Sequence, residues 1–125
     1  MNTLVNCLVG LIAIFHIGFL YLEMFLWSTP KGMKIFKLDP EFAQQSAALA
    51  SNQGLYNGFL AAGLIWSLLT PHSLLSFQLK IFFLSCVLVA GVYGWMTVSK
   101  TILYLQAIPA ATVLILVFLV QKSSS

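Results

Sequence analysis

The sequence contains few charged residues and no arginine at all. Only 7% of its 125 residues are charged, namely six lysines and three acidic residues, which gives a formal net charge of +3. A soluble domain carries about 25% charged residues, so this composition excludes an ordinary soluble protein. The positive charge is also too dilute for a nucleic-acid-binding protein, which needs a basic patch. We therefore expect no nucleic-acid partner.

Cysteine is scarce as well, with Cys7 and Cys86 the two examples. Both lie inside apolar segments at depths that differ by several residues of about 1.5 Å each, so we interpret them as small packing residues. No metal-ligand spacing occurs in the chain, and we expect neither a metal nor another cofactor. The N-terminal MNTLVN has no lysine or arginine, and no small-residue cleavage site follows, which predicts that no signal peptide is removed.

Long apolar runs dominate what is present, because 60% of the residues are hydrophobic. About 20 apolar residues suffice to cross a bilayer. The pattern predicts an all-α fold, a transmembrane four-helix bundle, in a single integral membrane domain covering residues 1–125. We expect the helices at about 4–27, 41–69, 77–98 and 102–120. The second should begin at Asp39-Pro40, because aspartate caps helices and proline is tolerated at the first helical position.

The distribution of lysines predicts the orientation in the membrane. On the side of the first and third connections lie four lysines, namely Lys31, Lys34, Lys37 and Lys100. On the side of the termini lie two, Lys80 and Lys122. Lysines concentrate in cytoplasmic loops. We therefore expect the first and third connections in the cytoplasm and both termini outside.

Two ionisable residues, His16 and Glu23, lie inside the first apolar run. Two helical turns separate them, which returns them to nearly the same face, about 10 Å apart along the axis. An ionisable group in the bilayer costs roughly 2.5–3.5 kcal/mol and marks a functional site by default. The structural alternative is interhelical hydrogen bonding, at only ~0.6 kcal/mol each. We interpret Glu23 as a catalytic acid or base and His16 as its catalytic partner. For His16 the structural alternative stays open, because a neutral histidine is cheaper to bury.

A polar block, NQGLYN, covers residues 52–57 of the second expected helix. By i, i+3 and i, i+4 spacing it contributes four side chains to one patch, namely Asn52, Gln53, Tyr56 and Asn57. Amides cannot carry out acid–base chemistry, but they can orient a carboxylate, a water or a substrate carbonyl or hydroxyl. We expect these residues to bind substrate. The structural alternative, which is compatible with the first, is that they only satisfy the hydrogen bonds of Glu23 and His16. In either case we expect an amide of this block to hydrogen-bond Glu23 or His16, directly or through one water.

Further polar and aromatic residues are expected at the same membrane depth or at the midplane. They are Trp27, Tyr93, Thr97 and Gln106. Because the first and third connections lie on one side of the membrane, these residues predict a polar pocket that opens toward that side, and we assign them to substrate binding. For Tyr93 an interfacial aromatic belt is the alternative.

Small residues recur at four-residue spacing on the second and third expected helices. The second helix has Gly54, Gly58 and Ala62, and the third has Ala90 and Gly94. Such stripes let membrane helices approach closely. We interpret them as packing surfaces without functional content, and we expect the second and third helices to be close neighbours.

Three blocks of sequence together resemble a known family. They are LEMFLW at 22–27, NQGLYNGFLAAGLIW at 52–66 and VAGVYGWMTVSKTILYLQAIPA at 89–110. With the intervening TPKGMKIFKL they are similar to small bacterial membrane proteins grouped as domain of unknown function 1304. The resemblance implies four transmembrane helices in the bacterial inner membrane and supplies no activity. Where that family often has an acidic residue before the histidine, this chain has Phe15, which speaks against a mechanism with two acids.

Three classes of function are compatible with these residues. The first is binding of a lipid or another lipophilic small molecule in a polar intramembrane pocket, with acid–base chemistry such as isomerisation or epoxide opening as its catalytic form. A looser likeness to the emopamil-binding-protein group of sterol isomerases, which also place His, Glu and Asn in a small membrane bundle, is an analogy of residue types only. The second is proton-coupled small-molecule efflux, for which the chain would work as a homodimer. The third is a structural or assembly role.

Overall fold

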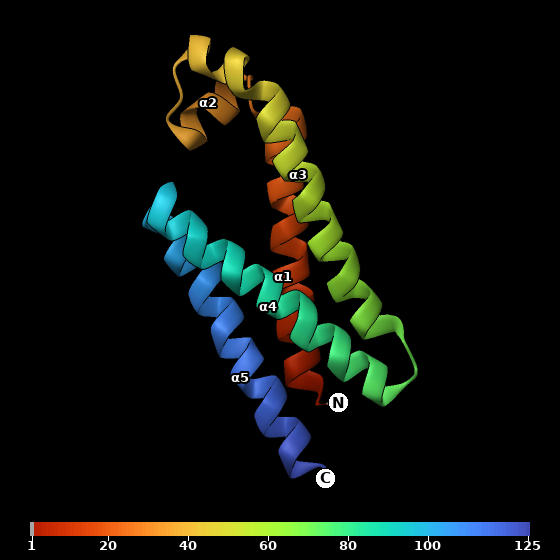
Figure 1. The fold of residues 1–125 in the computed structure, drawn as a ribbon. Helices are drawn as coiled ribbons and strands as arrows, with labels where there is room; N and C mark the ends of the chain where they lie inside the picture. The colour runs from red at the N-terminus through yellow and green to blue at the C-terminus, as the bar shows by residue number, and fades with distance from the viewer. Residues whose placement is uncertain (1) are drawn as a thin grey trace. The chain divides into compact units, whose positions relative to one another are not determined.

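The computed structural model describes residues 2–125, and all regular structure in that part of the chain is helical (Figure 1). The all-α prediction is confirmed. In chain order the elements are α1 (Thr3–Tyr21), the π-helix η1 (Leu22–Leu26), α2 (Pro30–Phe36), α3 (Pro40–Leu69), α4 (Ser73–Thr97), the π-helix η2 (Leu103–Ala107) and α5 (Ile108–Ser123).

Three helical stretches are long and apolar enough to cross a membrane. They are Thr3–Leu26, Ser73–Thr97 and Leu103–Ser123. At 30 residues α3 is the longest helix, but its first half, PEFAQQSAALASNQ, is polar or small and lowers its hydropathy. The prediction of four membrane-spanning helices is therefore not confirmed, and the five α-helices include a short one, α2, that the sequence did not predict. The membrane character itself is supported by the three apolar stretches.

Capping residues explain where α2 begins and ends and where α3 begins. Thr29 caps α2, since its hydroxyl accepts a hydrogen bond from the Gly32 amide at 3.2 Å, and the helix ends at Lys37, which adopts the left-handed conformation with φ 55°. The carboxylate of Asp39 accepts a hydrogen bond from the Phe42 amide at 2.9 Å. The predicted helix start at Asp39-Pro40 is thus confirmed.

The chain divides into two compact units. Unit 1 consists of the chain up to Ala13 together with Ala62–Ser125, and unit 2 is Ile14–Ala61. In unit 1, α4 and α5 run side by side (Figure 1) around buried aliphatic residues, among them Leu84, Val87 and Val117. In unit 2, the end of α1 and η1 pack against the first part of α3. The single-domain organisation remains a prediction.

Candidate functional site

Glu23 lies in the π-helix η1 and is buried, with 6% of its surface exposed. A π-helix inserts an extra residue into the helical path and is found frequently at functional sites. The segment LEMFL offers no proline or glycine that would break the helix, so α1 continues through it to Trp27. The irregularity therefore occurs at the acidic residue of an otherwise apolar helix.

The amide of Asn57 binds the Glu23 carboxyl group. Asn57 Nδ2 donates a hydrogen bond of 2.6 Å to Glu23 Oε1 from 34 positions away in the sequence. The prediction that an amide of the NQGLYN block contacts Glu23 is confirmed for this residue. Because a carboxyl group has two oxygens that each accept more than one hydrogen bond, the contact leaves acceptor capacity on Glu23.

Two glycines permit the close approach that this hydrogen bond requires. A Cβ atom added at Gly54 would lie 2.8 Å from the Met24 Cγ atom and 3.1 Å from the Glu23 Cβ atom, and one at Gly58 would lie 2.6 Å from the Leu20 Cδ1 atom. The small-residue stripe is thus a packing surface, as predicted. Gly54 and Gly58 face the first helix and η1. The expected contact between the second and third helices is present farther along α3, where the Ser67 carbonyl accepts hydrogen bonds from Ser76 and Lys80 of α4.

His16, the proposed partner of Glu23, lies near the end of α1 and is only 2% exposed. Its ring packs edge-on against Phe19, with ring centroids 5.3 Å apart. Both ionisable residues of the first apolar run are therefore buried within the protein, as their spacing and insertion cost predict. Whether they act as a catalytic pair remains a prediction.

The other predicted residues of unit 2 separate into two groups. Trp27 Nε1 donates a hydrogen bond of 2.9 Å to Ser46 Oγ, which ties the end of the first helix to α3. Asn52, Gln53 and Tyr56 have exposed side chains. Of the four side chains of the NQGLYN block, Asn57 is therefore the one that faces Glu23.

Tyr93, Thr97 and Gln106 belong to unit 1 and have local partners there. Gln106 lies in the second π-helix, η2, and its side-chain nitrogen donates to the Val87 carbonyl at 3.1 Å. The Thr97 hydroxyl donates to the Tyr93 carbonyl within α4 at 2.7 Å. Both hydrogen bonds go to backbone carbonyls within unit 1 and need no ligand. Substrate binding by Tyr93, Thr97 and Gln106 remains a prediction.

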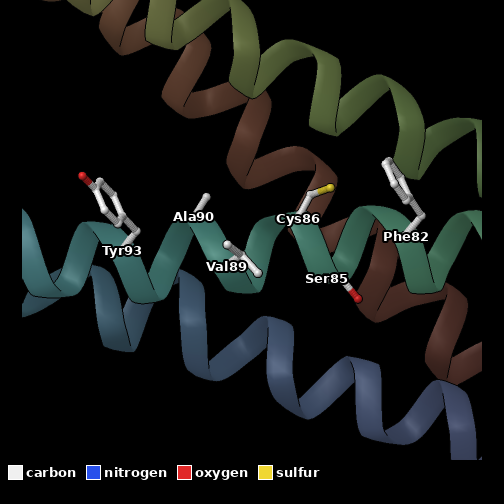
Figure 2. Close-up of a pocket in the computed structure, with 6 residues that line it drawn as sticks. All are labelled: Phe82, Ser85, Cys86, Val89, Ala90 and Tyr93. Carbon is white, nitrogen blue, oxygen red and sulfur yellow. The ribbon is translucent and has the colours of Figure 1, made fainter.

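Tyr93 also lines a shallow groove along α4. Figure 2 shows its six lining residues on successive turns of that helix, namely Phe82, Ser85, Cys86, Val89, Ala90 and Tyr93. The lining is almost entirely apolar. Such a surface suits acyl chains or another apolar helix rather than polar chemistry.

Lys80 is a candidate functional residue that the sequence analysis missed. The lysine count used it only as a charge on the side of the termini, but it is 1% exposed and contacts Ser76 and Ser67. A signal was present, because Lys80 follows several apolar residues of its helix and Ser76 precedes it by one turn. The residues of the described chain include no group of three or more histidine, cysteine or acidic side chains that could hold a metal ion.

Comparison with known proteins identifies the family. Residues 10–118 match the family model described as "Protein of unknown function (DUF1304)". The chain belongs to this family. It is 31% identical over 108 residues to the uncharacterised protein YpaA of Lactococcus lactis subsp. lactis (strain IL1403), an alignment that covers 85% of this chain and 89% of the relative. No solved structure matches. The resemblance inferred from the three sequence blocks is confirmed, and the family assigns no activity to the site around Glu23.

Proposed function

We propose that the site around Glu23 binds a lipophilic small molecule that carries a polar group, and that Glu23 exchanges a proton with it. The observation that carries this proposal is the buried carboxyl group of Glu23, held by the Asn57 amide within a π-helix. In this role Glu23 is the acid or base, His16 is its partner, and Asn57 fixes the orientation of the carboxyl group.

The energy cost of placing Glu23 in a membrane helix favours a function over a purely structural role. Placing an ionisable side chain inside a membrane helix costs roughly 2.5–3.5 kcal/mol, whereas one interhelical hydrogen bond contributes ~0.6 kcal/mol on average. The Glu23–Asn57 contact alone does not offset that cost. An asparagine or glutamine at position 23 would make the same hydrogen bond without a titratable proton.

The surroundings of Glu23 suit an amphiphilic ligand. The helices next to it carry exposed apolar and aromatic side chains, including Phe25 and Phe59, together with the exposed Gln53. Gln53 precedes Asn57 by one helical turn, so it is placed to bind a hydroxyl or carbonyl group of a ligand that contacts Glu23. The class of ligand that fits is a lipid or a lipid-like molecule with one polar group, located in the bilayer of a bacterial inner membrane.

Molecules that co-purify with the protein test this proposal. We expect the wild-type protein, isolated in nanodiscs, to retain a lipophilic molecule that mass spectrometry detects after extraction. Glu23→Gln, which keeps the shape and the Asn57 hydrogen bond, should reduce its occupancy by about tenfold, since roughly 1.4 kcal/mol of a charge-assisted contact is lost. Glu41→Gln is the matched control, because Glu41 is an exposed acidic residue of the same unit, and it should leave occupancy unchanged.

The other classes of function give different results in the same set of proteins. Equal occupancy in the wild type and in Glu23→Gln contradicts a ligand contact at Glu23. If Glu23→Gln instead abolishes pH-driven substrate flux in sealed vesicles, the proton-coupled transporter is the better description. A Glu23→Gln protein that is more stable and unchanged in both assays leaves the structural role, because a buried acid has then been replaced by an amide without loss.

A further inference from the structure

A buried lysine and a serine are in hydrogen-bond contact near the start of α4. Lys80 Nζ lies 2.6 Å from Ser76 Oγ and 3.4 Å from the carbonyl oxygen of Ser67. Ser76 Oγ in turn donates to the same Ser67 carbonyl at 2.6 Å. Lys80 is 1% exposed and Ser76 is 9% exposed. All three residues belong to unit 1, so the cluster is independent of the Glu23 site.

Among residues 2–125, the hydrogen-bond partners of Lys80 are a hydroxyl and a backbone carbonyl, and no carboxylate side chain is one of them. Lys80 is therefore not half of a buried ion pair, the usual structural explanation for a lysine in a protein interior. In its neutral form the amine can accept a proton from the hydroxyl that it contacts.

Ser76 opens onto a cavity. The cavity measures about 210 Å³ and is lined by Ser73 and Ser76 from α4 and by Val120, Gln121 and Ser124 from α5. Its lining is largely polar, and Lys80, which contacts Ser76, is not among the residues that line it. The volume is below the range of roughly 300–1,000 Å³ that drug-sized ligands occupy. A small molecule can therefore enter the cavity beside Ser76, whose hydroxyl contacts the Lys80 amine.

We propose that Ser76 is a nucleophile, that Lys80 is its general base, and that this cavity takes a small ester as acyl donor. Covalent catalysis uses a nucleophile and a base within about 2.6–3.2 Å of each other, together with a third group that orients the base. Serine–lysine pairs are one form of this arrangement. The Ser67 carbonyl supplies the third group. Rotation about the Cβ–Oγ bond of Ser76 turns the hydroxyl hydrogen from that carbonyl toward the Lys80 amine.

The proposed reaction is hydrolysis of the ester in two steps, with water as the second substrate. The Lys80 amine takes the hydroxyl proton of Ser76 as Oγ bonds to the acyl carbon, and the bond to the leaving oxygen breaks as Lys80 returns the proton to the departing alcohol. Water adds to the acyl-serine in the same way and releases the carboxylic acid, which restores Ser76. Gln121 lines the cavity, and its side-chain amide supplies a hydrogen-bond donor for the oxyanion formed in each step.

A serine-directed probe tests this assignment. Diisopropyl fluorophosphate phosphorylates an activated serine, since its P–F bond breaks as the Oγ–P bond forms and fluoride leaves with the hydroxyl proton. We expect mass spectrometry of the purified protein to map the adduct to Ser76. Removing the base by Lys80→Met should slow the labelling by about 100-fold or more. Lys122→Met removes an exposed lysine of the same unit and should leave the rate unchanged.

Three outcomes overturn the assignment. They are a folded wild-type protein without an adduct at Ser76, labelling of Ser76 no faster than that of the exposed Ser123 and Ser125, and an unchanged rate in a folded Lys80→Met. The comparison among serines needs no variant, so it decides the matter even if Lys80→Met does not fold. All three outcomes are independent of Glu23, so they leave the proposed function of unit 2 in place.

Discussion

At the scale of single residues, the energetics of an apolar environment predicted the burial of Glu23 and its hydrogen bond to an amide, which Asn57 makes, while the functional roles of both residues remain predictions. Glu23 was predicted from the cost of inserting an ionisable group into the bilayer. Asn57 was predicted because it belongs to a block of amides at the same expected membrane depth as Glu23. The sequence could not show which of Asn52, Gln53 and Asn57 contacts Glu23. Neighbours at i, i+3 and i, i+4 cover a wider arc of the helix than the face that contacts the first helix. Lys80 was missed, because a lysine near the start of a membrane helix is normally interpreted as a flanking charge.

The contact between Glu23 and Asn57 should be measurable as a coupling energy. In a double-mutant cycle with Glu23→Ala and Asn57→Ala, we expect thermal unfolding in detergent to give a coupling of about 0.6–1.7 kcal/mol, the range from average to largest for interhelical hydrogen bonds in membranes. The same cycle with Asn52→Ala should give a coupling near zero, because Asn52 is exposed. Equal coupling to Asn52 and Asn57 would contradict the observed geometry.

At the scale of elements, the apolar runs predicted the long helices, but their local geometry could not be predicted. The start of α3 followed from Asp39-Pro40, whose capping chemistry is local in the sequence. The π-helices η1 and η2 have no such signature, since LEMFL and LYLQA contain ordinary helix-forming residues and their geometry depends on tertiary contacts. The short helix α2 was not predicted, although Thr29 and Pro30 form a recognisable helix start.

The close packing beside Glu23 predicts a clear difference between two glycines. Gly54→Ala should destabilise the protein by about 1–3 kcal/mol, because the added methyl group meets Met24, the Glu23 Cβ atom and the Leu20 carbonyl oxygen. Gly18→Ala is the matched control in the same unit, since a Cβ atom there meets nothing within 4 Å, and it should be neutral or stabilising by up to about 1 kcal/mol. Thermal unfolding of both variants measures the difference. Equal effects would mean that Gly54 does not set the approach of η1 to α3.

At the scale of the whole molecule, composition predicted the all-α class, which the structure confirms, and a membrane protein, with which three apolar helical stretches are compatible. The family followed from three blocks of sequence. The number of spanning helices could not be predicted from the composition, because α3 combines the length of a membrane helix with a polar first half. The predicted orientation assumed four spanning helices and counted Lys80, which is buried, as a flanking charge, so the orientation remains a prediction.

The central claim is that Glu23 is a carboxyl group which lipophilic small molecules can reach from the membrane, and dicyclohexylcarbodiimide tests it most directly. This reagent partitions into lipid and modifies carboxylic acids there. Incubation of the protein in lipid nanodiscs followed by peptide mapping should place the adduct on Glu23, with Glu41 unmodified because it is exposed outside the apolar helices, and Glu23→Gln should remove the adduct. An intact, folded protein in which Glu23 stays unmodified, or in which Glu41 is modified to the same extent, would contradict the claim.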